Sequence, residues 1–233
     1  MFILHNMQSQ KVILAIITDS RPDMTLQCCV SILHLQAQLI QTQNGFQADM
    51  RFYPSHNEAI SDLYRSKDFG GIFIIKYSAG VPGEFALKSW RSKHDIVVGI
   101  HPMQSIDWDR VKEKITTTTE DISHTGIVYN LKLARMPDAE GFGKAKEIKA
   151  LDVMFIKRSA LEHIVKNNPE SISDDGQHSS IFLEGVYGGK YMTGVDRFVK
   201  LYGKDIYADA NLQCSKSACQ DYVGIVGNRS QLR

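Results

Sequence analysis

The 233-residue sequence has no apolar stretch long enough to span a bilayer. Its first residues, MFILHNMQSQK, place no basic residue before the short apolar run and no small-residue cleavage site after it. We therefore expect neither a signal peptide nor a membrane span, and we expect a cytoplasmic location.

Cysteine is scarce, and its spacing gives no zinc-binding pair. The four cysteines are Cys28, Cys29, Cys214 and Cys219, and no two of them form a C-x-x-C pair of the kind that binds zinc. Reduced thiols are therefore favoured over a disulfide framework.

Neither sign of charge is in excess. Lysine and arginine total 27 against 26 aspartates and glutamates, which gives a formal net charge of +1. A nucleic-acid binder that relies on bulk charge is therefore not expected. With 43% hydrophobic and 23% charged residues, the composition is that of an ordinary globular protein, and the length suffices for one α/β core.

The first 115 residues alternate between strand and helix patterns. Buried strands are expected at residues 12–17, 72–76 and 96–100, and a strand with less clean alternation at 46–53. Helices are expected at 23–41, from Ser55 onward, at 83–91 and in SIDWDRVKEKI, residues 105–115. Ser55 with Glu58 three residues later is a capping box at a helix start. This alternation predicts an α/β fold with a mixed, mostly parallel sheet flanked by helices.

After residue 116 the pattern is less regular. Strands are expected in GIVYNLKLA, EIKALDVMFIKR and KDIYADANLQC, and helices in RSALEHIVKN and MTGVDRFVKLYG. The stretch MPDAEGFGKAKE, residues 136–147, predicts a surface loop, with a lid over a substrate as the alternative.

One strand ends in a way that indicates a ligand site. In GGIFIIKYSAGVPGE, residues 70–84, an apolar run stops at Lys76, Tyr77 and Ser78. In open α/β sheets ligands bind at the edge where such strands end. An ammonium group at this edge either pairs with a diphosphate or is a solvated strand end.

The order of these segments resembles the GT-A nucleotide-sugar glycosyltransferases, particularly the short members from phages and large DNA viruses. The segment HDIVVGIHPMQSIDWDRVKEKI carries the resemblance most strongly. It continues in VILAIITDSRP, VMFIKRSALEHIV and KYMTGVDRFVKLYGKDIYADANLQCSK, and covers residues 11–216 in order. The resemblance implies one GT-A-like domain over residues 1–233, with a nucleotide-binding half at about 11–115, an acceptor half at about 116–216 and a tail at 217–233.

The residues that hold a metal in that family are altered here. A typical member ends this strand with Asp-x-Asp, which binds Mn²⁺ or Mg²⁺ against the diphosphate. This sequence has Lys76, Tyr77 and Ser78 there, and Cys214 near the place of a metal-binding histidine. The sequence therefore requires no metal. Because the family uses Mn²⁺ or Mg²⁺, a bound divalent cation stays an alternative. His56, His101 and His124 have no metal-binding spacing and are expected to be structural.

The family's catalytic acid is altered as well. Members open the late helix with Ser-Glu-Asp, whereas this sequence has Thr193, Gly194 and Val195, followed by Asp196. Asp196 is either a displaced general base for the acceptor hydroxyl or a surface acid.

Other site residues follow from the resemblance. The implied nucleotide-binding residues are Thr18, Asp19, Arg21, Asn57 and Ser78. Each of the first three is also explained by an ordinary turn before a helix. Asp152 enters a strand, where it either faces the acceptor site or ends an edge.

Two functions are therefore expected. The first is a glycosyltransferase that uses a nucleotide-sugar donor and an unknown acceptor, with unusual or absent metal dependence. Lys76 would stabilise the leaving diphosphate and Asp196 would be the base. The second is a catalytically inactive GT-A-like scaffold that binds a nucleotide, a sugar or a protein partner. A nucleotidyltransferase is less favoured, because TDSRPD after the first strand contains no glycine-rich phosphate loop.

Overall fold

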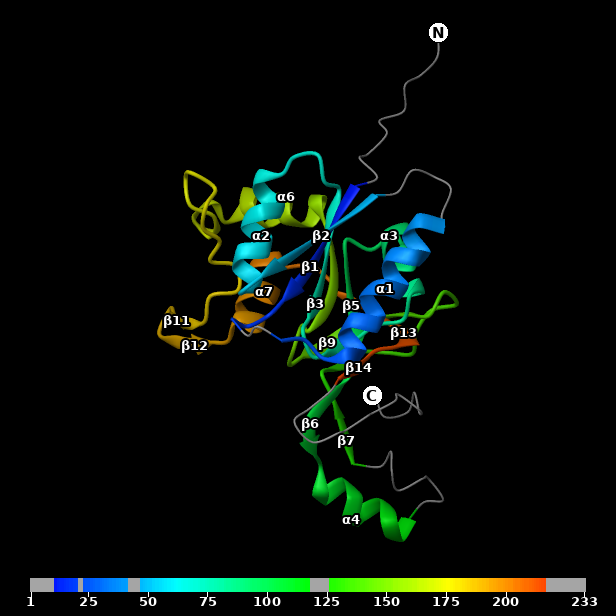
Figure 1. Ribbon diagram of the computed structural model, residues 1–233. Helices are drawn as coiled ribbons and strands as arrows, with labels where there is room; N and C mark the ends of the chain where they lie inside the picture. The colour runs from blue at the N-terminus through cyan, green and yellow to red at the C-terminus, as the bar shows by residue number, and fades with distance from the viewer. Residues whose placement is uncertain (1–10, 21–22, 42–46, 118–125, 217–233) are drawn as a thin grey trace.

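An eight-stranded mixed sheet forms the centre of the computed structural model, which describes residues 11–20, 23–41, 47–117 and 126–216 (Figure 1). In spatial order the strands are β2 (Gln47–Tyr53), β1 (Lys11–Ile17), β3 (Gly71–Lys76), β10 (Val153–Lys157), β5 (Ile96–Ile100), β13 (Tyr207–Gln213), β9 (Phe142–Ile148) and β8 (Leu131–Leu133). The α/β class predicted from the sequence is confirmed.

The prediction of a mostly parallel sheet is wrong. β1 pairs in parallel with β2 and β3, and β5 with β13, but the other four neighbouring pairs are antiparallel. The reason is that β10, from the second half of the chain, inserts between β3 and β5, while β9 and β8 extend the far side of the sheet. Alternating strand and helix patterns do not reveal such an insertion.

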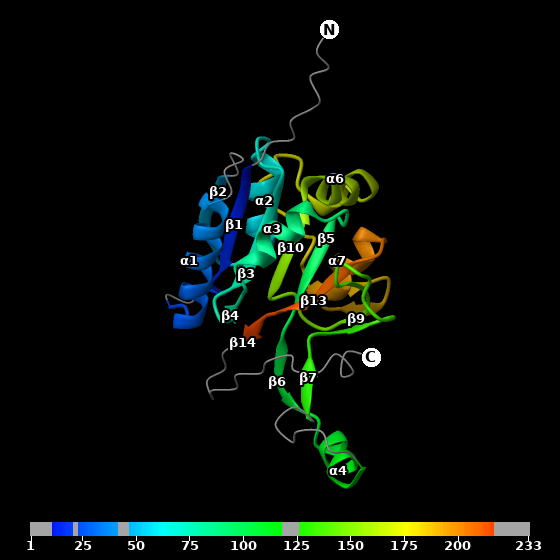
Figure 2. The same ribbon diagram turned by 90° about the vertical axis from the view of Figure 1, so that its right-hand side faces the viewer.

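Helices cover both faces of the sheet (Figures 1 and 2). One face packs against α1 (Leu26–Gln41) and α3 (Glu84–Arg91). The other packs against α2 (His56–Arg65), α6 (Arg158–Asn167) and α7 (Gly194–Tyr202). β1 is buried on both faces because its side chains alternate between the two cores.

Smaller elements lie outside the main sheet. β4 (Ala79–Gly80) pairs with β14 (Ser215–Lys216), β6 (Pro102–Ile106) with β7 (Ile127–Tyr129), and β11 (Gly185–Tyr187) with β12 (Lys190–Met192), and a short 3₁₀ helix covers Pro169–Ser171. Figure 2 shows that β6, β7 and α4 (Trp108–Thr117) project as an arm away from the body. None of the helices within the described residues is long and apolar enough to cross a membrane.

Several predicted elements are confirmed and three need correction. The Ser55 hydroxyl caps α2 by accepting a hydrogen bond from the Glu58 amide at 3.4 Å. GIVYNLKLA forms two strands separated by Asn130, and EIKALDVMFIKR divides between β9 and β10. Residues 142–147 of the predicted surface loop or lid belong to β9, because this segment pairs with β13 on one side and β8 on the other. Cys28, Cys29 and Cys214 are free thiols, and Cys219 lies outside the described residues.

Candidate functional site

Five charged or titratable side chains gather where β1, β3 and β5 end and β10 begins. Asp19 follows β1, Lys76 ends β3, His101 follows β5 and Asp152 precedes β10, while Lys216 comes from β14. β10 runs antiparallel to its neighbours, so its first residue lies at the edge where they finish. The Lys76 amide donates to the Asp152 carbonyl at 2.7 Å, which joins the two strands at this point.

Two ion pairs organise this edge. The Lys76 ammonium lies 2.7 Å from the Asp19 carboxylate, and both side chains are partly exposed. The Lys216 ammonium pairs with the Asp152 carboxylate, and these side chains are only 14% and 7% exposed. The site therefore contains two cations and two anions from four separate segments.

The pKa values of these groups reflect both burial and pairing. Burial opposes the charge of Lys76, but the hydrogen bond to Asp19 and the charge of Asp152 raise the Lys76 pKa above its ordinary value. Burial likewise opposes ionisation of Asp152, but His101, Lys216 and Lys76 together lower the Asp152 pKa. Lys76 is therefore charged and Asp152 is ionised near neutral pH.

The loop after β1 has a strained backbone. Asp19 and Ser20 have φ values of 50° and 60°, in the left-handed region that favours glycine. Thr18 closes the strand end, since its amide and hydroxyl donate to the Tyr53 carbonyl at 2.9 and 3.3 Å. Strain of this kind costs about 1–3 kcal/mol per residue and concentrates at functional sites.

A glycine at the strained position is expected to stabilise the fold. Ser20→Gly should raise the free energy of unfolding by about 0.5 kcal/mol, because relief of the positive φ exceeds the entropy that glycine adds to the unfolded chain. Urea denaturation measures this difference. The matched control is Ser66→Gly, where φ is −80° and the same change should be destabilising. Equal effects of the two changes would contradict the strain.

Two histidines that the sequence assigned to structural roles adjoin this cluster. His56 Nε2 donates to the Leu151 carbonyl at 3.2 Å, and His101 Nε2 lies 3.6 Å from the Asp152 carboxylate. Burial lowers the pKa of both histidines, so both are neutral near pH 7. Asn130 supports this region, because it accepts from the His101 amide and donates to the Gly99 carbonyl, both at 3.0 Å.

Asp196, the predicted general base, is hydrogen-bonded within the first turn of α7. Asp196 and Thr193 form the capping box of α7, with the Asp196 carboxylate 2.8 Å from the Thr193 hydroxyl. At Gly194 a Cβ atom would lie 2.4 Å from the Phe182 carbonyl oxygen, so the backbone leaves no room there for the family's glutamate. A base role for Asp196 stays a prediction.

The remaining predicted nucleotide-binding residues lie around the cluster in different ways. The Asn57 side chain accepts from the Phe182 amide at 2.8 Å, which anchors the loop before α7. Ser78 is buried in the turn between β3 and β4. Arg21 and His124 lie outside the described residues.

The altered metal positions do not suit a divalent cation. Lys76 places a positive charge where the family has carboxylates, and Cys214 is buried in the core beside Gly99, where burial raises the pKa of its thiol. Within the described ranges, no three His, Cys, Asp or Glu side chains come together as metal ligands.

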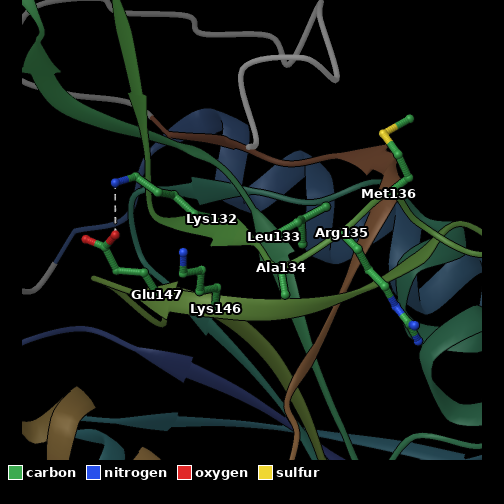
Figure 3. Close-up of a pocket in the computed structure, with 7 residues that line it drawn as sticks. All are labelled: Lys132, Leu133, Ala134, Arg135, Met136, Lys146 and Glu147. Atoms are coloured by element: carbon green, nitrogen blue, oxygen red, sulfur yellow. Dashed lines mark ion pairs between the residues drawn. The ribbon is translucent and has the colours of Figure 1, made fainter.

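A pocket of about 490 Å³ lies away from this cluster, beside β8 and β9 (Figure 3). Lys132 pairs with Glu147 at 2.9 Å, and Figure 3 shows Arg135 pointing away from that pair. Lys146 and Met136 also line the pocket. Three cationic side chains with one carboxylate suit an anionic group on a ligand.

No family model matches this chain, and no curated protein matches it in sequence. Its function must therefore be argued from the geometry of the sheet edge.

Sequence reasoning missed Lys216 and the environment of His101. Lys216 lies two residues after the last predicted strand, much as Lys76 ends an earlier one, and this similar pattern is a signal that was available. His101 follows the apolar strand at 96–100 and therefore had the same signal. Only the pairing of β14 with β4 brings Lys216 to Asp152.

Proposed function

We propose that this chain binds a nucleotide sugar at the edge formed by β1, β3, β10 and β14, as a GT-A-like glycosyltransferase in which lysines replace the divalent metal. The observation that carries the proposal is the pair Lys76 and Lys216. Their ammonium groups come from strands far apart in the chain, yet both act electrostatically on Asp152. The position also supports it, because open α/β sheets bind ligands where their strands end.

Two ammonium groups suit the diphosphate of such a donor. Fixed positive charge stabilises the negative charge that develops on a departing nucleoside diphosphate. Asp19 and Asp152 hold the lysines in position before the ligand arrives, and the phosphates then replace the carboxylates as partners. The Lys76–Asp19 pair is partly exposed and contributes about 0–1 kcal/mol, so exchanging it costs little.

Transfer itself requires further groups. The bond from the sugar C1 to the diphosphate oxygen breaks, a bond from C1 to the acceptor oxygen forms, and the hydroxyl proton passes to a base. Asp196 is the proposed base; its Oδ2 atom is held by the Thr193 amide and hydroxyl in the α7 capping box, so the proton would go to its Oδ1 atom. The basic pocket beside β8 and β9 is the proposed contact for an anionic part of the acceptor.

A catalytically inactive scaffold is the second candidate, and two observations favour it. The Asp196 carboxylate is engaged by Thr193, and the backbone around Gly194 excludes a glutamate. The scaffold would bind a nucleotide at the same site as the glycosyltransferase but would not transfer the sugar.

Nucleotide binding is the first test. UDP, GDP, CMP, TDP and their common sugar conjugates are titrated calorimetrically in EDTA and in Mn²⁺. One nucleotide series is expected to bind in EDTA, and Lys76→Met and Lys216→Met should each weaken it by about 10–100-fold, as expected for loss of a charged hydrogen bond. Lys112→Met, which removes a lysine that is 77% exposed on α4, is the matched control and should bind normally.

The outcomes separate the candidates. Binding that requires Mn²⁺, or no binding by any nucleotide, would overturn the lysine site. Release of nucleoside diphosphate from the bound sugar conjugate in the presence of acceptor glycans indicates the transferase. Binding without any release indicates the scaffold.

A further inference from the structure

A single carboxylate oxygen in the cluster has two neighbours that can pair with it. The Asp152 Oδ2 atom accepts the Lys216 ammonium, and the same atom lies 3.6 Å from His101 Nε2. At 3.6 Å the histidine makes no hydrogen bond, so Lys216 is the partner that Asp152 has. His101 is fully buried, and within the described residues its Nε2 atom has no hydrogen-bond partner.

The hydrogen bonds of His101 determine which ring nitrogen carries its proton. Nδ1 lies 3.0 Å from the Pro102 carbonyl oxygen, which can only accept, so Nδ1 is the donor. In neutral His101, Nε2 therefore presents a lone pair toward the Asp152 carboxylate. Adding a proton at Nε2 would turn this unfavourable arrangement into a charge-assisted pair.

The charges that face His101 come from three elements. Asp152, before β10, favours the protonated ring, whereas Lys216 of β14 and Lys76 of β3 oppose it. Burial opposes protonation most strongly and keeps the pKa of His101 below its ordinary value. Moving Lys216 away from Asp152 removes one opposing charge and frees the Oδ2 atom at the same time.

We propose that Lys216 and His101 are alternative partners of Asp152, so that an anionic ligand that draws Lys216 away makes His101 take up a proton. The proton comes from solvent and binds at Nε2, and Asp152 stays ionised throughout. The identity of the ligand rests on the proposed function above. The exchange of partners does not, and it can be tested without any nucleotide.

The sign of the pH dependence follows directly. If ligand binding raises the affinity of His101 for a proton, then protons raise the affinity for the ligand by the same factor. The affinity for the ligand should therefore increase as the pH falls through a window. The upper limit of this window is the pKa of His101 in the ligand-bound protein, and the lower limit is its pKa in the free protein. The increase is at most about tenfold per pH unit.

The ligand-free test is a histidine titration by NMR. In Lys216→Met the pKa of His101 is expected to rise relative to wild type, with His101→Asn identifying its signal and Lys112→Met as control. Asparagine keeps a donor for the Pro102 carbonyl and removes the Nε2 atom. An unchanged His101 pKa in a folded Lys216→Met protein would overturn the proposal. If that variant does not fold, Lys216→Gln serves in its place.

The ligand test counts protons. Inorganic pyrophosphate and the best nucleotide are titrated at pH 6.5 in buffers of different ionisation enthalpy. The ligand's own phosphates have a pKa of about 6 and release protons when they bind lysines, so the result is read as the difference from His101→Asn. Wild type is expected to take up about 0.5–1 proton more per site than His101→Asn. His56→Gln, which alters the neighbouring histidine while keeping a donor for Leu151, should preserve this difference. Binding with the same proton balance in wild type and His101→Asn refutes this inference and leaves the proposed function standing. Absence of binding refutes the proposed function. The NMR titration then still tests whether Lys216 and His101 are alternative partners of Asp152.

Discussion

Lys88→Met is expected to lower the free energy of unfolding by about 3–5 kcal/mol, because it leaves a buried carboxylate without its counter-ion. Asp209 on β13 has no exposed surface, and its two carboxylate oxygens lie 2.8 and 2.7 Å from the Lys88 ammonium on α3. The same ammonium lies 5.0 Å from the centre of the Phe142 ring. Urea denaturation at pH 7 measures the loss.

A second substitution distinguishes the unpaired charge from lost packing. Adding Asp209→Asn to Lys88→Met should recover much of the stability, since the amide oxygen still accepts from the Asn211 amide and no charge remains buried. Lys112→Met, at an exposed ion pair of 3.7 Å, should change stability by less than about 0.5 kcal/mol. A double variant that is as unstable as Lys88→Met would contradict the charge argument.

Asp152→Asn is expected to lower the free energy of unfolding and to raise the affinity for a diphosphate. Loss of the carboxylate leaves Lys216, which is 14% exposed, without its partner, and should cost about 2–4 kcal/mol at pH 7. The freed ammonium should bind a diphosphate more tightly, by about 3–10-fold, because it no longer has to leave Asp152. Denaturation and calorimetric titration of the same protein measure the two effects.

The pH dependence gives this prediction a further check. The folded-state pKa of Asp152 is lowered, so its contribution to stability is complete above about pH 4 and is lost as the pH falls through that lowered value. The stability difference between wild type and Asp152→Asn should therefore shrink in acid. Asp109→Asn, at a side chain that is 97% exposed, is the control and should show no such difference. A variant that loses stability without tighter binding would mean that Asp152 is purely structural.

The local elements were largely predictable, and their pairing was not. The strands at 12–17, 72–76 and 96–100 are short apolar runs between polar turns, which is a strong signal for buried strands. VMFIK is equally apolar, but nothing in its composition reveals that it runs antiparallel between β3 and β5. Strand direction depends on contacts between distant segments, and periodicity contains no information about these.

The candidate site was predictable to a similar extent. Lys76 was identified because it ends a buried strand, and Asp19 from the family resemblance; the structure brings them together. The role of Asp152 as the partner of Lys216 could not be predicted, because it depends on β14 returning to the sheet edge. Asp196 was identified from the family motif, yet the pattern Thr-x-x-Asp at 193–196 is also the ordinary signal for a capping box.

The position of β10 has a consequence for how the chain is made. When residues 1–115 have left the ribosome, β3 and β5 exist but the strand that joins them has not yet been synthesised. Their facing edges remain open, and open edges pair readily with other chains. The sheet can be completed only after β10, which ends at Lys157, and then β13 have been synthesised. Pairing between such distant segments is slow, so we expect slow folding. Residues 11–115 are therefore not expected to form a stable fragment on their own.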